Sequence, residues 1–505
     1  MADSRIRTAR KNIVVSLLGQ IVTLACGLVV PGALLRAFGS EVYGACSSIT
    51  QFLSYIALLE GGIGGVARAA LYKPLAHRDG DAIWAILAEI RRFFQVILLI
   101  FGVYVLALAF GFQNLTRVEG LDRMTTFFLV IVISLSTFAQ YGIGIPHSIL
   151  LQAAQMSYIT NGVNILATLA NGISVVLLVR GGWGILWVKL AGSLIYGIKP
   201  VVLWLYVRRH FPAGKSPRRD KQYLTQKWSG LGQHIAYFLH SNTDIAILTW
   251  FADFKAVAIY TVYHMIVTNI QNLAAAFVSG MEALFGDMLA KGEENALGKT
   301  FEAYELGISV VSVTLFSVTE ILILPFVRLY TQGISDADYQ APVFAWLLIL
   351  SALLYCLRLP YHAVVIAAGH FAQTKAAAYG EALLNILASV LLVSRMGLVG
   401  VAVGTAVATL FRFLYYAAYL SKHILKRDIR RFLKRFGVNL AIFGFSCWAG
   451  NLALSKIHIT GYITWGAWGL LVFLLEGAFV VGINVVCYRK AFVDLGRTAL
   501  ARFGK

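Results

Sequence analysis

Charged residues are scarce in this chain of 505 residues. Only 13% are Asp, Glu, Lys or Arg, whereas 59% are hydrophobic, and the mean hydropathy is +0.74. A soluble protein of this size carries about 25% charged residues to face water, so roughly half of the expected charge is missing. The shortage excludes an ordinary soluble enzyme or binding module and indicates that the main solvent of the chain is lipid.

Residues that usually hold metals or disulfides are also few. The five cysteines lie in or beside apolar segments without metal-binding spacing, and the ten histidines form no HExxH motif and no pair four residues apart. We therefore expect no disulfide, no metal site and no cofactor.

Long apolar segments run through the whole chain, and each reaches the ~20 residues that an α-helix needs to cross a bilayer. Their pattern is continuous rather than alternating, and lipid leaves no partner for an open strand edge, so strands are excluded. We predict an all-α polytopic membrane protein with about fourteen transmembrane helices, the first of them retained because no cleavage site follows it. The predicted spans are residues 12–37, 42–67, 92–113, 123–152, 157–180, 183–207, 229–252, 255–286, 302–329, 340–368, 373–394, 397–421, 434–454 and 461–487.

Positive charge is distributed unevenly over the predicted loops. If the N-terminus is inside, most of the 43 lysines and arginines fall on inner loops and tails, above all in "RRHFPAGKSPRRDKQ" and "KHILKRDIRRFLKR". Cationic loops resist translocation, so we predict that both termini are cytoplasmic. The net charge of +19 is then explained by topology and by contact with anionic membrane lipids, and no nucleic-acid partner is expected.

An internal repeat accompanies this topology. "SLLGQ" at 16–20 is similar to "SGLGQ" at 229–233, and "NGISVVLLVRGGWG" at 171–184 resembles "NILASVLLVSRMG" at 385–397 at nearly the same shift along the chain. That shift maps the first six predicted helices onto the next six, a common transporter design with a binding site between two lobes. We predict an N-lobe at 1–210, a basic cytoplasmic linker at 211–228, a C-lobe at 229–421, and two further helices with a cytoplasmic tail at 422–505.

The stretch "YIALLEGGIGGVARAAL" at 55–71 contains a GxGxxA pattern that could suggest a dinucleotide site. No strand precedes the glycines and no βαβ unit surrounds them, so this interpretation fails. We predict instead that Glu60 is an anchor within the N-lobe and that Gly61 and Gly65, in GxxxG spacing, let another helix approach closely or provide a bend for gating.

The segment "KNIVVSLLGQIVTLACGLVVPGALLRAFGSEVYGACSSITQFLSYIALLEGGIGGVARAALYKPLA" resembles the N-terminal region of bacterial polysaccharide-biosynthesis flippases, within the multidrug/oligosaccharidyl-lipid/polysaccharide (MATE-like) superfamily. The resemblance implies movement of a polyprenyl-pyrophosphate-linked oligosaccharide from the cytoplasmic to the outer leaflet of the bacterial inner membrane by alternating access. By analogy it also implies a polysaccharide polymerase and a chain-length regulator as partners.

Polar side chains within the spans are the candidate site residues, because each is costly in lipid unless it faces protein or water. The clearest stripe, on the seventh helix, follows i, i+4, i+7, i+11. In the resembled fold, helices one, two, seven and eight border the central cavity. The residues that we expect to face it are Gln20, Gln51, Gln233, Tyr237, His240, Asp244, His264 and Gln271.

Buried cations form a second set, of which Arg358, Arg412 and Lys189 are predicted to bind phosphate or acidic sugars. The alternative is that they pair with Glu320, Glu381 or Glu60 to lock helices, or extend to an interface. Asp244 and His240, within reach of each other on one helix face, are candidates for coupling to a proton or sodium gradient; a simple interhelical hydrogen bond is the alternative for each.

Two other functions compete with the flippase. A drug or metabolite exporter of the same superfamily would favour an acidic cavity, against which the buried cations count. A membrane glycan polymerase or ligase would need sizeable outer loops, whereas the longest, near "QNLTRVEGLDR", is close to a simple connector. We therefore expect a transporter rather than an enzyme.

Overall fold

The protein is built from α-helices. The computed structural model describes residues 2–60, 63–115, 121–211, 242–276, 281–455 and 459–489, with residues 235, 238, 239 and 457, and no strand occurs in these ranges. The helices are α1 (Ala2–Ser54), η1 (Tyr55–Glu60), α2 (Ile63–His77), α3 (Gly80–Leu115), α4 (Arg123–Ala139), η2 (Gln140–Gly144), α5 (Ile145–Ala153), α6 (Ser157–Arg180), α7 (Ile185–His210), α9 (Asp244–Phe251), α10 (Phe254–Ala276), α11 (Met281–Ala290), α12 (Glu294–Tyr330), α13 (Pro342–Ala367), α14 (Phe371–His423), α15 (Ile429–Leu454) and α16 (Tyr462–Cys487).

Ten helical segments among the described residues are long and apolar enough to cross a membrane. Two of them, α1 and α14, each contain a break, at Gly39 (φ 80°) and Gly397 (φ 53°). Glycine adopts these positive φ values without steric cost. Both breaks fall where the sequence predicts the boundary between two spans, so each of these helices is a pair of spans. The chain is a multi-pass all-α membrane protein, as predicted.

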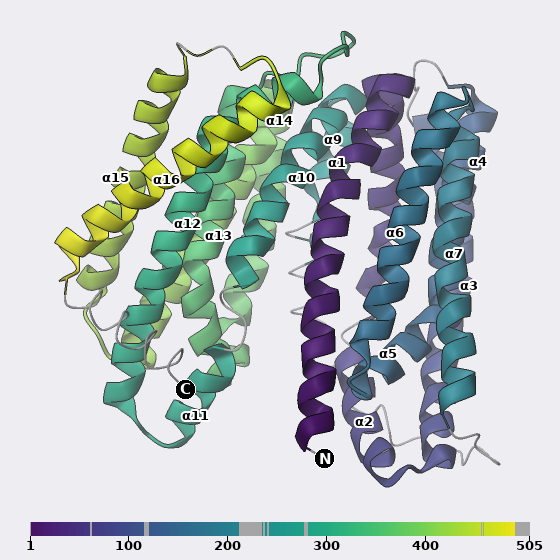
Figure 1. Cartoon of the computed structure of the whole chain (residues 1–505), viewed down its shortest axis with the longest axis horizontal. Coiled ribbons are helices and arrows are strands. Elements are labelled where there is room, and N and C mark those ends of the chain that lie inside the picture. The colour runs from purple at the N-terminus through teal and green to yellow at the C-terminus, as the bar shows by residue number, and fades with distance from the viewer. Residues whose placement is uncertain are drawn as a thin grey trace. The chain divides into compact units, whose positions relative to one another are not determined.

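The first compact unit comprises residues 1–238 together with 253–258. In it α1 packs against α6, α6 against α7, and α7 and α3 against α4 (Figure 1). Aromatic rings fill the space between α3 and η2, where Phe94 and Phe101 pack on Tyr141 with centroid distances of 5.8 and 6.3 Å. Large rings bury the most apolar area per residue, so this cluster fixes the packing of α3 against the following helix pair.

Two predicted helices of this unit are interrupted. The helix predicted at 42–67 stops at Ser54, continues as a 3₁₀ turn to Glu60, and resumes as α2 at Ile63. The helix predicted at 123–152 contains a π turn, Gln140–Gly144, which ends two residues before Pro146. A proline inside a helix lacks an N–H donor and its ring clashes with the carbonyl four residues earlier, which accounts for the irregular turn at this place.

The second compact unit comprises residues 239–252 and 259–505. Its centre is formed by α12, α13 and α14, and the last two helices, α15 and α16, pack on α12, which α16 crosses obliquely (Figure 1). Trp465 of α16 donates its indole N–H to the Leu322 carbonyl of α12 at 3.1 Å. The predicted linker 211–228 lies outside the described residues apart from Phe211. The same holds for most of residues 229–241, at the beginning of predicted helix seven.

The internal repeat is visible in the backbone. Four residues just after a helix have positive φ, and they form two pairs, Arg78 with Gly292 and Gln155 with Gly369. The two members of each pair are separated by the same number of residues, close to the shift of the sequence repeat. In all four places the next amide bonds the carbonyl five residues earlier, at 2.8 to 3.2 Å, which is the Schellman helix ending. The two halves of the chain thus end corresponding helices by the same motif, with glycine only in the second copy.

Candidate functional site

A buried carboxylate network lies in the second unit, at the first residue of α9. Asp244, which is 6% exposed, accepts hydrogen bonds at Oδ2 from the Tyr260 hydroxyl of α10 at 2.9 Å and from Thr405 Oγ1 of α14 at 3.0 Å. The carboxylate therefore joins three helical segments. Burial of a carboxylate in a membrane protein is costly unless such partners compensate it.

Further oxygen atoms extend this network along α14. Asn385 Nδ2 donates to Thr405 Oγ1 at 3.3 Å, and Ser389 Oγ lies 3.4 Å from both Asn385 Oδ1 and the Val401 carbonyl. A carboxylate, an amide oxygen, hydroxyls and a backbone carbonyl are the donor set that hard cations prefer. The described residues include no group of three His, Cys, Asp or Glu side chains that could hold a transition metal. The chemistry of this cluster suits an alkali cation or a proton.

The predicted cations Arg358 and Arg412 come together on one carboxylate, also in the second unit. Arg358 Nη1 donates to Glu381 Oε1 at 2.7 Å, and Arg412 Nη1 bonds the other oxygen, Oε2. Glu381 is fully buried, and the two arginines are 4% and 8% exposed. Of the two alternatives drawn from the sequence, pairing with Glu381 is what the structure shows. The triad nevertheless keeps a formal excess of one positive charge.

Aromatic side chains surround this triad. The guanidinium of Arg358 lies over the Tyr355 ring at 4.9 Å, and that of Arg412 lies over Tyr416 at 5.3 Å. His362 packs edge-on against Tyr416. The Nε atoms of both arginines are buried without a hydrogen-bond partner among the described residues. Because a buried N–H without an acceptor is costly, the triad has unused capacity to bind an anion.

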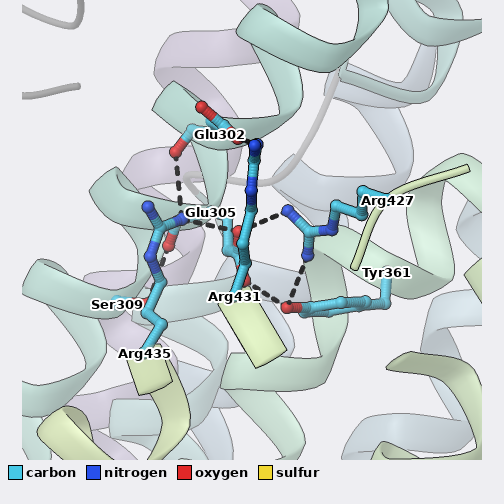
Figure 2. Close-up of polar contacts among 7 residues, drawn as sticks. All are labelled: Glu302, Glu305, Ser309, Tyr361, Arg427, Arg431 and Arg435. Carbon is cyan, nitrogen blue, oxygen red and sulfur yellow. Dashed lines mark hydrogen bonds and ion pairs between the residues drawn. The ribbon is translucent and has the colours of Figure 1, made fainter. Parts of the chain in front are cut away.

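A second buried acid, Glu305 of α12, ties α15 and the segment before it to α12 and α13 within the second unit (Figure 2). It accepts hydrogen bonds from the Tyr361 hydroxyl of α13, from Arg435 Nη1 of α15 at 2.5 Å, and from Arg427 Nη1 at 3.3 Å. Arg427 also lies over the Phe301 ring at 4.7 Å. Since this carboxylate is shared by donors from three segments, the cluster is an anchor.

Glu305 is not among the acids that the sequence suggested as partners of the buried cations, which were Glu60, Glu320 and Glu381, although it lies inside a predicted span. The signal was available, because the basic loop "KHILKRDIRRFLKR" and the beginning of predicted helix nine are on the same predicted side of the membrane. Asn385, Ser389 and Thr405 were missed as well; the first two are four residues apart in an apolar run and so share a helix face.

Lys189 of α7 has a different environment from the two arginines. It is half-buried, lies near Cys46 of α1, and makes no hydrogen bond or ion pair with the described residues. Lys199, further along the same helix, donates to Asn164 Oδ1 at 3.0 Å. Within the described part of the chain, Lys189 is therefore the cation of the predicted set that keeps its full hydrogen-bonding capacity for a ligand.

The other predicted polar residues are placed singly. Gln20 is exposed on α1, and Gln51 Nε2 donates to Ser54 Oγ at 3.1 Å. His264 stacks on Tyr260 with a centroid distance of 5.1 Å, which places it beside the Asp244 network. Gln271 is half-buried on α10. Gln233, Tyr237 and His240 lie outside the described residues.

The glycine-rich stretch at 55–71 does not act as predicted at one position. A Cβ added to Gly65 would meet no atom within 4 Å, so the expected close approach of another helix is wrong there. The residue is exposed, because it lies on the face of α2 opposite to the buried Ile63 and Ala67. Gly61 lies outside the described residues. Glu60 accepts a hydrogen bond from the Tyr141 hydroxyl, a contact within the first unit.

Comparisons with known proteins identify structures with a similar fold. No protein-family model and no curated protein sequence matches the chain. A solved structure described as the lipid II flippase MurJ in an inward closed conformation matches with a TM-score of 0.67, over 95% of this chain and 99% of the other, at 12% identity.

Two multidrug transporters match as well. An inward-facing MATE family transporter of the MOP superfamily gives a TM-score of 0.61, over 79% of this chain and 95% of the other, at 15% identity. The MATE multidrug transporter DinF-BH gives 0.52, over 83% of this chain and 95% of the other, at 16% identity. The chain thus has the fold that MurJ and the MATE transporters of the MOP superfamily share, as the resemblance of its N-terminal region predicted.

Proposed function

We propose that the protein is a flippase that moves a polyprenyl-pyrophosphate-linked oligosaccharide across the bacterial inner membrane by alternating access, in the biosynthesis of a polysaccharide. The observation that carries the proposal is the full-length match to the fold of a lipid flippase, combined with buried arginines in the second unit and the half-buried Lys189 in the first. A polysaccharide polymerase and a chain-length regulator are the partners that this role implies.

The cations suit the head group of such a substrate. A pyrophosphate loses its hydration when it enters the membrane, and charge-assisted hydrogen bonds from guanidinium or ammonium groups can replace that water. Lys189 offers an ammonium without a partner among the described residues, and the arginines around Glu381 offer a positive excess with unused Nε donors. Aromatic rings at Tyr355 and Tyr416 add apolar faces of the kind that pack against sugar rings.

Asp244 is the residue that we propose for ion coupling. Its carboxylate, with Thr405 and the Asn385 and Ser389 side chains, forms an oxygen-rich cluster that joins α9, α10 and α14. A cation or proton that binds there changes the charge at the junction of these helices. Its binding can therefore bias their packing, which is how a gradient does work in alternating access.

The test is a reconstituted flipping assay. The purified protein is placed in liposomes that contain polyprenyl-linked glycan, and the rate at which glycan becomes accessible to an added glycosidase is measured under imposed proton and sodium gradients. We expect protein-dependent exposure that falls about tenfold or more in Lys189→Gln and in Arg358→Gln, since a charged hydrogen bond contributes about 1.5–3 kcal/mol.

Matched controls separate binding from structure. Lys199→Gln retains a donor for Asn164 and is expected to transport like the wild type. Asp244→Asn is expected to remove the response to the gradient while leaving downhill exposure. Exposure that is unchanged in the Lys189 and Arg358 variants would contradict the proposed cationic site but not the flippase function.

The alternative is an exporter of small molecules, favoured by the fold match to multidrug transporters. It predicts no glycan exposure under any gradient, together with gradient-dependent loss of a cationic dye from the liposomes. That pair of results would replace the flippase proposal.

A further inference from the structure

A pocket of about 250 Å³ opens in the first unit where α3, η2, α5 and α7 meet. Gly142 and Ile143 of the π turn and Pro146 of α5 form part of its wall, and π turns are frequent at functional sites. Its lining residues are Arg91, Gly142, Ile143, Pro146, His147, Val201 and Trp204.

The charged groups in and beside this pocket are cationic. Arg91, which lines the pocket, is exposed. Arg208 is not part of the lining, but its guanidinium lies over the ring of the lining residue Trp204 at 5.1 Å. Neither arginine makes an ion pair with the described residues. His147, which is 8% exposed, has its Nδ1 2.6 Å from the Ile143 carbonyl. A carbonyl only accepts, so Nδ1 carries the hydrogen, and Nε2 of the neutral ring is an acceptor that suits a hydroxyl of a ligand rather than its phosphate. None of the lining residues is acidic.

The pocket lies at the border between a basic end and an apolar span. Arg91 and Arg92 directly precede the apolar run of α3, and α7 ends with Arg208, Arg209 and His210. Beyond these charges the exposed surface is apolar, with Leu99 74% exposed on α3 and Val201 38% exposed on α7. Arginine and tryptophan at such a border mark the level of the lipid head groups.

We propose that this pocket binds the head group of an anionic phospholipid. The phosphate would contact Arg91 and Arg208, the glycerol region would pack on Trp204, and the acyl chains would follow the exposed apolar faces of α3 and α7. Basic pockets between transmembrane helices at the cytoplasmic side bind anionic head groups in this way. Sites for drug-sized ligands typically begin at roughly 300 Å³. The pocket is smaller than that, so a head group fits it better than a whole small-molecule substrate.

The experiment uses Trp204 as the reporter. The full-length protein is reconstituted in phosphatidylcholine vesicles that contain increasing amounts of phosphatidylglycerol brominated near the head group, or of phosphatidylcholine brominated in the same way. The contribution of Trp204 is obtained by subtracting the quenching measured for Trp204→Phe. We expect saturable quenching by brominated phosphatidylglycerol and weaker, linear quenching by brominated phosphatidylcholine.

Arginine variants test the assigned contacts. Arg91→Gln and Arg208→Gln are each expected to lower the apparent affinity for phosphatidylglycerol about fivefold. The neighbours in sequence, Arg92→Gln and Arg209→Gln, make the same change in total charge and are expected to have little effect. Equal quenching by the two brominated lipids, or equal losses in the Arg92 and Arg91 variants, would overturn the proposal.

A competition distinguishes two lipid phosphates. Unbrominated polyprenyl phosphate at an equal mole fraction is expected to leave the quenching unchanged. If it displaces phosphatidylglycerol, the pocket belongs to the transported lipid and the assignment to a membrane phospholipid is wrong.

Discussion

Replacing Glu381 by glutamine tests the buried arginine pair most directly. The fully buried carboxylate bonds Arg358 and Arg412, whose side chains are only 5% and 9% exposed. Glutamine keeps one acceptor oxygen and turns an N–H₂ donor towards the other arginine, so a buried cation is left without its counter-charge. Removing one partner from a buried pair costs about 3–5 kcal/mol. For a unit of this size that corresponds to a fall in Tm of roughly 6–20 °C.

The assay is the loss of monodisperse protein after heating in detergent, followed by size-exclusion chromatography. Glu294→Gln is the matched control, because Glu294 pairs with Lys426 at the surface, where the lysine and glutamate side chains are 67% and 74% exposed. The double variant Glu381→Gln, Arg358→Gln should lose less than the two single variants together, since it removes the uncompensated charge along with its partner. A fall of less than about 2 °C in Glu381→Gln, the effect of an exposed pair, would refute the buried triad.

Three further changes test the fold around the site, each by the same heating assay. Glu305→Gln should destabilise the protein by about 3–5 kcal/mol, whereas Glu302→Gln, whose partner Arg431 is 68% exposed, should cost at most about 1 kcal/mol; similar losses would contradict the anchor role. Gly400→Ala should lower the stability by about 1–3 kcal/mol, because the added Cβ would lie 2.6 Å from the Leu392 carbonyl. Gly437→Ala, where no atom lies within 4 Å of the added Cβ, should be neutral or stabilising. The reverse order of stabilities would refute the tight turn within α14. Gly369→Ala should lower the stability by about 1–2 kcal/mol, and Gln155→Gly should raise it by a similar or smaller amount, because both positions have positive φ. A lower stability of Gln155→Gly would argue against equivalent helix endings.

The sequence by itself determined the fold class. Continuous apolar runs leave a membrane chain no alternative to helices. Gly39 falls between two predicted spans and Gly397 is the first residue of one, and glycine takes the positive φ values of these breaks at little cost. The internal repeat and the family resemblance could also be recognised in the sequence, because both consist of short local patterns that do not depend on how the helices pack. The presence of buried cations and of Asp244 could likewise be predicted, since each charge interrupts an apolar run.

Only the tertiary structure decided what those charges contact. Glu381 lies 23 residues from Arg358 and 31 from Arg412, and the Glu305 anchor joins residues up to 130 positions apart, so no periodicity could pair them. Sequence spacing placed Gly65 in a packing motif, whereas the fold leaves it in open space. Sequence spacing also could not show that Arg358 and Arg412 share the Glu381 carboxylate, or that Lys189 pairs with none of the described residues. An ion pair depends on which helices meet in the fold. Composition and local backbone preference thus set the elements, and long-range packing set the chemistry of the site.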